Sequence, residues 1–216
     1  MIDAILNAAP AWALTHAAPL LVMVPLFLAP VLALVPTGRI AWLISIVATG
    51  ISFLFSLILL GLVQTSPIGV VSYEIGSWSV PLGIELRVDA LNAMILLIVT
   101  TIGLLASVFS WPTVVAEIPR QKRALFYSAF LVCFAGLNGV AITGDAFNLF
   151  VFLEISSIST YVLVALGSGR DRRALPAAFN YLIMGTIGAS FYIIGIGFLY
   201  AATGTLNMYD ISTQLP

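Results

Sequence analysis

The sequence contains very little charge. Only 8% of its 216 residues are Asp, Glu, Lys or Arg, whereas 61% are hydrophobic and the mean hydropathy is +1.13. Because a soluble domain usually carries about a quarter charged residues, this composition indicates a membrane protein. The formal net charge of −1 provides no basic field for nucleic acid.

Cysteine and histidine are also scarce. Cys133 is the one cysteine and His16 the one histidine, so the chain has no internal disulfide and too few ligands for a conventional metal site. The sequence also lacks a glycine-rich phosphate loop, a haem ligation pattern and an iron–sulfur cysteine set. We therefore expect no cofactor and no metal in this chain, and any redox chemistry would belong to other subunits.

Long apolar runs are abundant. A helix needs about 20 apolar residues to cross a hydrocarbon core of ~30 Å. The sequence predicts one membrane domain over residues 1–216, an all-α polytopic bundle whose first span is kinked by prolines such as Pro25; neighbouring helices can satisfy the carbonyls that those prolines free. The six predicted spans are 18–35, 40–63, 89–110, 123–143, 146–166 and 177–201.

Basic residues predict the orientation of these spans. Seven of the eight Lys and Arg residues fall in the loops that follow the first, third and fifth spans: Arg39; Arg120, Lys122 and Arg123; Arg170, Arg172 and Arg173. By the positive-inside rule those loops are cytoplasmic. We predict a multi-pass protein of the inner (cytoplasmic) membrane with both termini on the external, periplasmic side.

The loop between the second and third spans has the pattern of a short external β-hairpin. Apolar residues alternate with polar ones around Tyr73 and again around Leu86. Its charged residues, Glu74, Glu85, Arg87 and Asp89, are expected to form a solvated surface or, alternatively, a contact with another subunit.

Glu154 is the feature of the apolar runs that most needs explaining. It lies nine residues after Asp145, which is expected to cap the fifth span. At 1.5 Å per residue the carboxyl is ~13 Å into the helix, close to the middle of the membrane. An acid at that depth costs about 2.5–3.5 kcal/mol on insertion scales, and an ionisable group inside a membrane is a functional candidate by default. The alternative is a protonated structural acid that hydrogen-bonds a neighbouring helix.

Helical spacing selects the neighbours of this acid. Ser157 and Tyr161 follow at i+3 and i+7 and share its face. Asn138 in the fourth span and Asn180 in the sixth are secondary candidates that could approach Glu154 from across the bundle and orient water; each is alternatively an interhelical hydrogen-bonding group. The small residues of the sixth span, including Gly185, Gly188 and Gly195, are expected to serve close helix packing.

Three segments resemble one known family. GDAFNLFVFLEISSISTYVLVAL resembles the fifth helix of the D-type subunit of multisubunit (Mrp-type) cation/proton antiporters, and of the related antiporter-like subunits of respiratory complex I and membrane-bound hydrogenases. YEIGSWSVPLGIELRVDALNAMILL is similar to the segment leading into their third helix, and FNYLIMGTIGASFYIIGIGFLYAATGTLNM to their sixth.

The resemblance implies a proton-translocating subunit in which Glu154 matches the essential glutamate of the family. It covers the first three helices and three helices of the first five-helix repeat, and the C-terminal remainder of the family fold is not in these 216 residues. The family pairs this glutamate with a lysine on a seventh, discontinuous helix, and many relatives carry another lysine where this chain has Asn180. The only lysine here is Lys122, in a loop.

Three functions are therefore open. The first is a subunit, or N-terminal fragment, of a cation/proton antiporter that moves H⁺, with Na⁺ as a candidate for the exchanged cation. The second is a proton-pumping subunit in the membrane arm of an NADH:quinone oxidoreductase or hydrogenase, in which case the whole complex but not this chain is an enzyme. The third is a non-conducting structural subunit. All three imply a lipid bilayer and other membrane subunits as partners.

Overall fold

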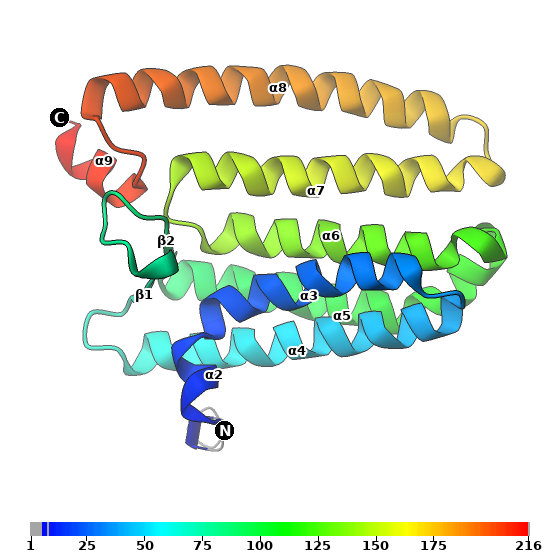
Figure 1. Ribbon diagram of the computed structural model, residues 1–216, viewed down its shortest axis with the longest axis horizontal. Helices are drawn as coiled ribbons and strands as arrows, with labels where there is room; N and C mark the ends of the chain where they lie inside the picture. Colours follow the sequence, from blue (N-terminus) through cyan, green and yellow to red (C-terminus); the bar gives the residue numbers. More distant parts are fainter. Residues whose placement is uncertain (1–5, 8, 216) are drawn as a thin grey trace.

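Six long helices lie side by side in the computed structural model, which describes residues 6, 7 and 9–215 (Figure 1). Each is long and apolar enough to cross a membrane, which confirms the predicted all-α architecture of six spans. They are α3 (Ala17–Leu34), α4 (Gly38–Thr65), α5 (Ala90–Glu117), α6 (Arg123–Ile142), α7 (Ala146–Leu166) and α8 (Ala174–Thr203). The short helices are α2 (Ala11–Thr15), η1 (Ile75–Ser77), η2 (Arg120–Lys122), η3 (Gly167–Gly169) and α9 (Met208–Gln214).

The helix α5 is longer than predicted. The predicted span ended at residue 110, before Pro112, but the helix continues through this proline to Glu117. A proline inside a helix removes one backbone hydrogen bond and crowds the carbonyl four residues earlier. The helix nevertheless continues, because the sequence around Trp111 and Val114 remains apolar. The helix ends where Ile118, in an extended conformation, precedes Pro119.

A neighbouring helix satisfies the carbonyl that Pro25 frees in α3. Pro25 has no N–H, so the carbonyl oxygen of Leu21, four residues earlier, lacks its usual helical donor. The hydroxyl of Ser52 on α4 donates to that oxygen over 3.1 Å, and both Leu21 and Ser52 are fully buried. The expectation that another helix supplies the missing donor is thus confirmed at this proline.

The helices α3, α4, α5 and α6 form a packed unit, with α7 beside α6 and α8 beside α7 (Figure 1). Small residues allow α7 to approach closely, because a Cβ at Gly136 would meet Ser156 and one at Gly139 would collide with Phe152. Within the described chain, 61% of the apolar window of α6 is buried against only 6% of that of α8. The helix α6 is therefore central and α8 is attached through α7.

The predicted hairpin is confirmed. Strands β1 (Val71–Glu74) and β2 (Glu85–Val88) pair antiparallel, with Val71 opposite Val88. The hairpin lies over one end of the bundle together with the α6–α7 turn and α9, and we call this the hairpin end (Figure 1). Backbone bonds join the three parts, since Gly144 N–H donates to Glu85 O and Met208 N–H donates to Gly144 O, each over 2.8 Å.

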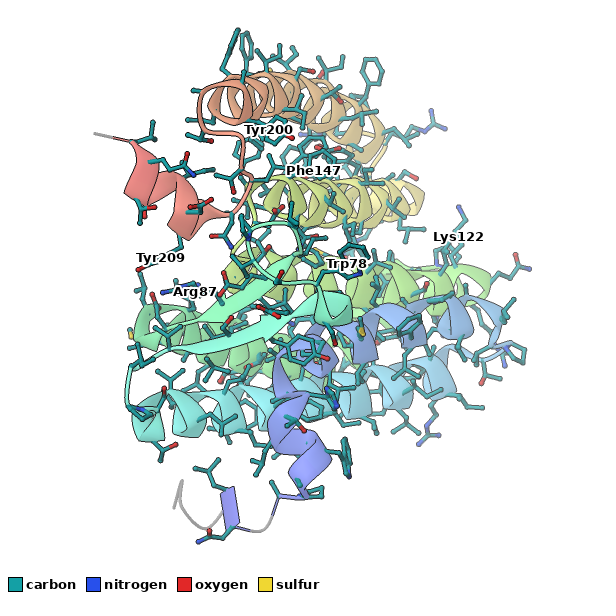
Figure 2. All side chains as sticks on the ribbon, turned by 60° about the vertical axis from the view of Figure 1, so that its left-hand side comes forward. Trp78, Arg87, Lys122, Phe147, Tyr200 and Tyr209 are labelled. Carbon is teal, nitrogen blue, oxygen red and sulfur yellow. The ribbon has the colours of Figure 1, made fainter. Side chains whose placement is uncertain are left out.

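The prediction that the charges of this loop form a solvated surface is wrong for Glu85. Its side chain is buried, accepts hydrogen bonds from Ser72 (2.6 Å) and Asn207 (2.7 Å), and lies 3.6 Å from the guanidinium of Arg87. Arg87 in turn lies 4.4 Å from the centre of the Tyr209 ring, on α9 (Figure 2). Buried charges need such partners, so these residues hold the hairpin against α9.

The three basic loops lie together at the opposite end, which we call the basic end (Figure 1). A Cβ at Gly38 would collide with the Arg123 side chain, and Arg170 pairs with Glu117 at 3.4 Å. The loops after α3, α5 and α7 are therefore on one side of the bundle, as the charge pattern predicted.

Candidate functional site

The helix α7 that carries Glu154 begins at a defined cap. Asp145 accepts a hydrogen bond from Asn148 N–H over 2.7 Å, so the predicted N-cap is confirmed. Asp145 is buried, and that burial raises the pKa of its carboxyl, although the backbone hydrogen bonds from Asn148 and Phe147 partly oppose the effect. Glu154 follows nine residues later, on the side of α7 that meets α8.

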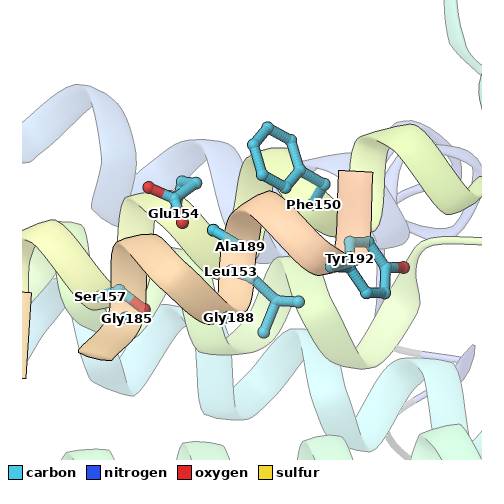
Figure 3. Close-up of a pocket in the computed structure, with 8 residues that line it drawn as sticks. All are labelled: Phe150, Leu153, Glu154, Ser157, Gly185, Gly188, Ala189 and Tyr192. Atoms are coloured by element: carbon cyan, nitrogen blue, oxygen red, sulfur yellow. The ribbon is translucent and has the colours of Figure 1, made fainter. Parts of the chain in front are cut away.

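Glu154 and Ser157 line one hollow between α7 and α8 (Figure 3). Its volume is about 260 Å³, and Glu154 itself is half-buried. From α7 the hollow is lined by Phe150, Leu153, Glu154 and Ser157, and from α8 by Gly185, Gly188, Ala189 and Tyr192. The carboxyl group of Glu154 and the hydroxyl of Ser157 give it its polar character on the α7 side.

The hollow exists because α8 presents almost no side chains opposite the acid. A Cβ at Gly188 would meet no atom of the described residues within 4 Å, and the same holds at Gly195 and Gly197. The prediction of close helix packing is therefore confirmed at Gly185, where a Cβ would collide with Tyr161, but within the described chain it is wrong at Gly188, Gly195 and Gly197. At Gly188 the missing side chain leaves space in front of Glu154 instead.

Tyr161 lies next to the hollow, toward the basic end, although it is not one of its lining residues. It is buried, with its ring edge-on to that of Tyr181 on α8 at a centroid distance of 5.0 Å. Its hydroxyl lies against Gly185, where an added Cβ would collide with it. Tyr161 thus borders the space that Glu154 and Ser157 line.

Sequence reasoning missed Phe150 and Tyr192, which close the hollow toward the hairpin end. Their rings are stacked 6.4 Å apart with an interplanar angle of 10°. Phe150 precedes Glu154 by one helical turn, so i−4 spacing would have placed it on the same face. Its pairing with Tyr192 depends on the register of two helices, which periodicity does not give.

Among the described residues, no basic group pairs with Glu154. The ion pairs Arg87–Glu85, Arg170–Glu117 and Arg173–Asp171 all lie at the two ends of the bundle. No three His, Cys, Asp or Glu side chains of the described chain gather as a metal site. The chemistry available in the hollow is that of one carboxyl group with hydroxyl neighbours, which can take up and release a proton.

Asn138 does not approach Glu154. It is fully buried in α6 and lies eleven residues after Tyr127, a spacing that returns to the same helix face. Tyr127 hydrogen-bonds Ser110 on α5 at 3.1 Å, whereas Gly136 marks the face toward α7. Asn138 therefore points into the α3–α6 unit, and neither polar atom of its amide has a hydrogen-bonding partner among the described residues.

Asn180 also lies away from the hollow. It is exposed, near the start of α8. The Tyr161–Tyr181 and Phe150–Tyr192 pairs set an antiparallel register that places Asn180 level with Val162, about two helical turns from Glu154. Of the predicted site residues, the structure brings Glu154, Ser157 and Tyr161 together and leaves both asparagines apart.

Comparisons with known proteins agree with this architecture. A family model described as "NADH:quinone oxidoreductase/Mrp antiporter, TM" matches residues 143–215, the segment that holds Glu154 and the hollow. The chain is 46% identical over 144 residues to the N subunit of the NADH-quinone oxidoreductase of Desulforudis audaxviator, covering 67% of this chain and 28% of the relative. It is 35% identical over 171 residues to the D-type subunit of the Na⁺/H⁺ antiporter of Bacillus subtilis, covering 79% and 33%.

A solved structure shares the fold. A chain of the membrane-bound sulfane sulfur reductase, an archaeal respiratory membrane complex, superimposes with a TM-score of 0.80 and 30% identity, over 92% of this chain and 40% of that one. The chain thus spans about a third of the length of the curated relatives, and it is a multi-pass integral membrane protein like them. By its sequence and its fold, it belongs to the family of membrane subunits common to NADH:quinone oxidoreductases and Mrp antiporters.

Proposed function

We propose that this chain translocates protons as part of a multisubunit cation/proton antiporter, with Glu154 as the group that carries the proton. The observation that supports this most directly is the hollow in front of Glu154, because it gives an acid inside a membrane-spanning bundle both space and a polar neighbour, Ser157. Glu154 is eight residues into α7, so its depth is ~12 Å from the helix start. A carboxyl at that depth is rare unless it has a function.

The proposed roles follow from position. Glu154 is the carboxyl group that takes up the proton and passes it on. Ser157 and Tyr161 orient water in the hollow. Because no described basic group pairs with Glu154, we propose that another membrane subunit supplies its basic partner, and that the chain represents the N-terminal part of the family fold.

Flux measurements test the role of Glu154. In vesicles that contain the complete assembly, Glu154→Gln keeps the shape of the side chain but cannot ionise, so flux driven by a pH gradient should be abolished. Glu154→Asp should retain part of it. Glu117→Gln, at an acid on the basic-end surface, is the matched control and should transport normally. Normal flux in Glu154→Gln would refute the relay and leave a structural subunit as the better interpretation.

The transported ion is proposed from the relatives. One relative is named as part of a Na⁺/H⁺ antiporter, so exchange of H⁺ for Na⁺ is the first candidate. The 46% identity to a subunit of an NADH-quinone oxidoreductase supports the second candidate, a proton pump in the membrane arm of a redox complex. An imposed Na⁺ gradient should drive proton movement in the first case, and electron donors should drive it in the second.

We further propose that the basic end faces the cytoplasm and that both termini lie on the external side of the cytoplasmic membrane. The gathering of the basic loops at one end supports this orientation. Epitope tags at residues 1 and 216 should then be accessible only from outside the cell. Tags that react only from the cytoplasmic side would invert the assignment.

A further inference from the structure

The seam between α7 and α8 carries one aromatic pair on each side of Glu154. Phe150 and Tyr192 form the pair toward the hairpin end, and Tyr161 and Tyr181 form the pair toward the basic end. Phe150 precedes Glu154 by four residues, or ~6 Å along the helix, and Tyr161 follows it by seven, or ~10 Å. Along the seam, the acid and its hollow therefore lie between the two aromatic pairs, and we call this stretch the Glu154 compartment.

Tyr192 separates this compartment from a second hollow. That hollow has a volume of about 370 Å³ and lies toward the hairpin end, where Ala146, Ile196 and Met208 are among its lining residues. Both hollows share Tyr192 as a wall. Its hydroxyl donates to the carbonyl oxygen of Ala146 over 3.3 Å, and this bond holds the ring across the seam.

Tyr161 and Tyr181 contact each other across the seam on the basic-end side of the hollow. The edge-to-face arrangement at 5.0 Å fills the seam just beyond Ser157, and the Tyr161 hydroxyl rests on Gly185. Tyr161 is buried but Tyr181 is 49% exposed, so the Tyr181 ring has room to turn away. Tyr192 is similarly only part-buried.

We propose that these two aromatic pairs are the access gates of the Glu154 compartment, the Phe150–Tyr192 pair toward the hairpin end and the Tyr161–Tyr181 pair toward the basic end. The inference rests on the proposed function of Glu154 and adds the route by which the acid meets each side. A proton carrier that reached both sides at once would only leak, so the two gates must not open together. In this proposal Tyr161, Tyr181 and Tyr192 control access to Glu154 and do not themselves carry the proton.

Thiol labelling tests the gates. The reporter is Ser157→Cys in a Cys133→Ala background, within the complete assembly in vesicles of known orientation. A membrane-impermeant thiol reagent is applied to one side at a time, and modification of this chain is followed by mass spectrometry. Tyr192→Ala should raise the labelling rate from the hairpin end about tenfold, in proportion to the open fraction of that gate. Tyr181→Ala should do so from the basic end only.

Two further variants separate gating from general disruption. Tyr192→Phe keeps the stacked ring and loses only the bond to Ala146, so its labelling rate should stay within a factor of about two of the parent. Tyr200→Ala removes an exposed tyrosine of α8 outside the compartment and should change nothing. Unchanged labelling in both gate variants, or an equal rise from both sides in either one, would overturn the proposal.

The labelling result does not depend on proton transport. If Glu154→Gln transported normally, the proposed relay would fail, yet side-specific labelling in the two gate variants would still establish the access routes. If Glu154→Gln abolished flux but neither gate variant changed labelling, the proposed role of Glu154 would be supported and the proposed gates would be refuted.

Discussion

The amide of Asn207 donates a 2.7 Å hydrogen bond to the carboxylate of Glu85, a residue 122 positions earlier in the chain. Both side chains are buried, at 1% and 4% exposed. This contact fastens the loop after α8 to the hairpin after α4, so one buried bond joins the first and last parts of the bundle at the hairpin end.

Breaking this bond should destabilise the fold. Asn207→Ala leaves one oxygen of a buried carboxylate without its donor, so the free energy of unfolding should fall by about 2 kcal/mol. Denaturant unfolding in detergent, followed by circular dichroism, measures this. A double-mutant cycle with Glu85→Gln should give a coupling of about 1 kcal/mol, and additive effects would contradict the contact. Asn180→Ala, at an exposed amide, is the control and should be neutral.

Asp145 should make stability depend on pH. Because burial raises its pKa in the folded state, the folded chain holds this proton more tightly than the unfolded chain. The resulting stabilisation is fully present below the ordinary aspartate pKa of about 4 and is lost as the pH rises through the raised value. Asp145→Asn should remove that loss while keeping an N-cap. The measurement is the free energy of unfolding of the unmodified chain and of Asp145→Asn as the pH is raised from about 4. If the two proteins showed the same dependence on pH, the prediction would be wrong.

Asn138→Leu should stabilise the protein. The amide of Asn138 is fully buried and has no hydrogen-bonding partner among the described residues, so an apolar side chain of similar size removes a desolvation cost of about 1–3 kcal/mol. Asn92→Leu is the matched comparison and should destabilise, because the Asn92 amide donates to Ala141 O over 2.7 Å. Equal destabilisation by the two substitutions would mean that a bound partner satisfies Asn138.

Gly185 and Gly188 should respond differently to the same small change. Gly185→Ala places a Cβ against the Tyr161 hydroxyl and should cost about 1–3 kcal/mol. Tyr161→Phe removes that hydroxyl and should restore most of the loss in the double variant. Gly188→Ala meets no described atom within 4 Å and should stabilise α8 by up to about 1 kcal/mol through helix propensity. Similar losses at both glycines would contradict the geometry.

Features that depend on residues close together in the sequence could be predicted. The six spans follow from apolar runs, the hairpin follows from alternation around Tyr73 and Leu86, and the cap follows from Asp145 at the head of an apolar run. In each case the cause lies within a few residues of its effect, so no knowledge of tertiary contacts is needed.

Features that depend on which helices meet could not be predicted. The burial of Glu85 is set by Asn207, far along the chain, and the local pattern of a charged loop indicates solvent instead. Asn138 is polar and central in sequence, but only the packing of α6 decides that it turns toward α5. The hollow at Glu154 likewise depends on the register that sets Gly188 opposite the acid, and helical periodicity carries no such register.

The bond between Ser52 and Leu21 has a consequence for how this family varies. The Ser52 hydroxyl replaces the N–H donor that Pro25 lacks, so the loss of a hydrogen bond on α3 is compensated by a residue on α4. Natural homologues that keep the proline should keep a hydroxyl-bearing residue at the serine position, and those that lose the proline should be free to place alanine or valine there. Positions 25 and 52 should therefore covary among the homologues.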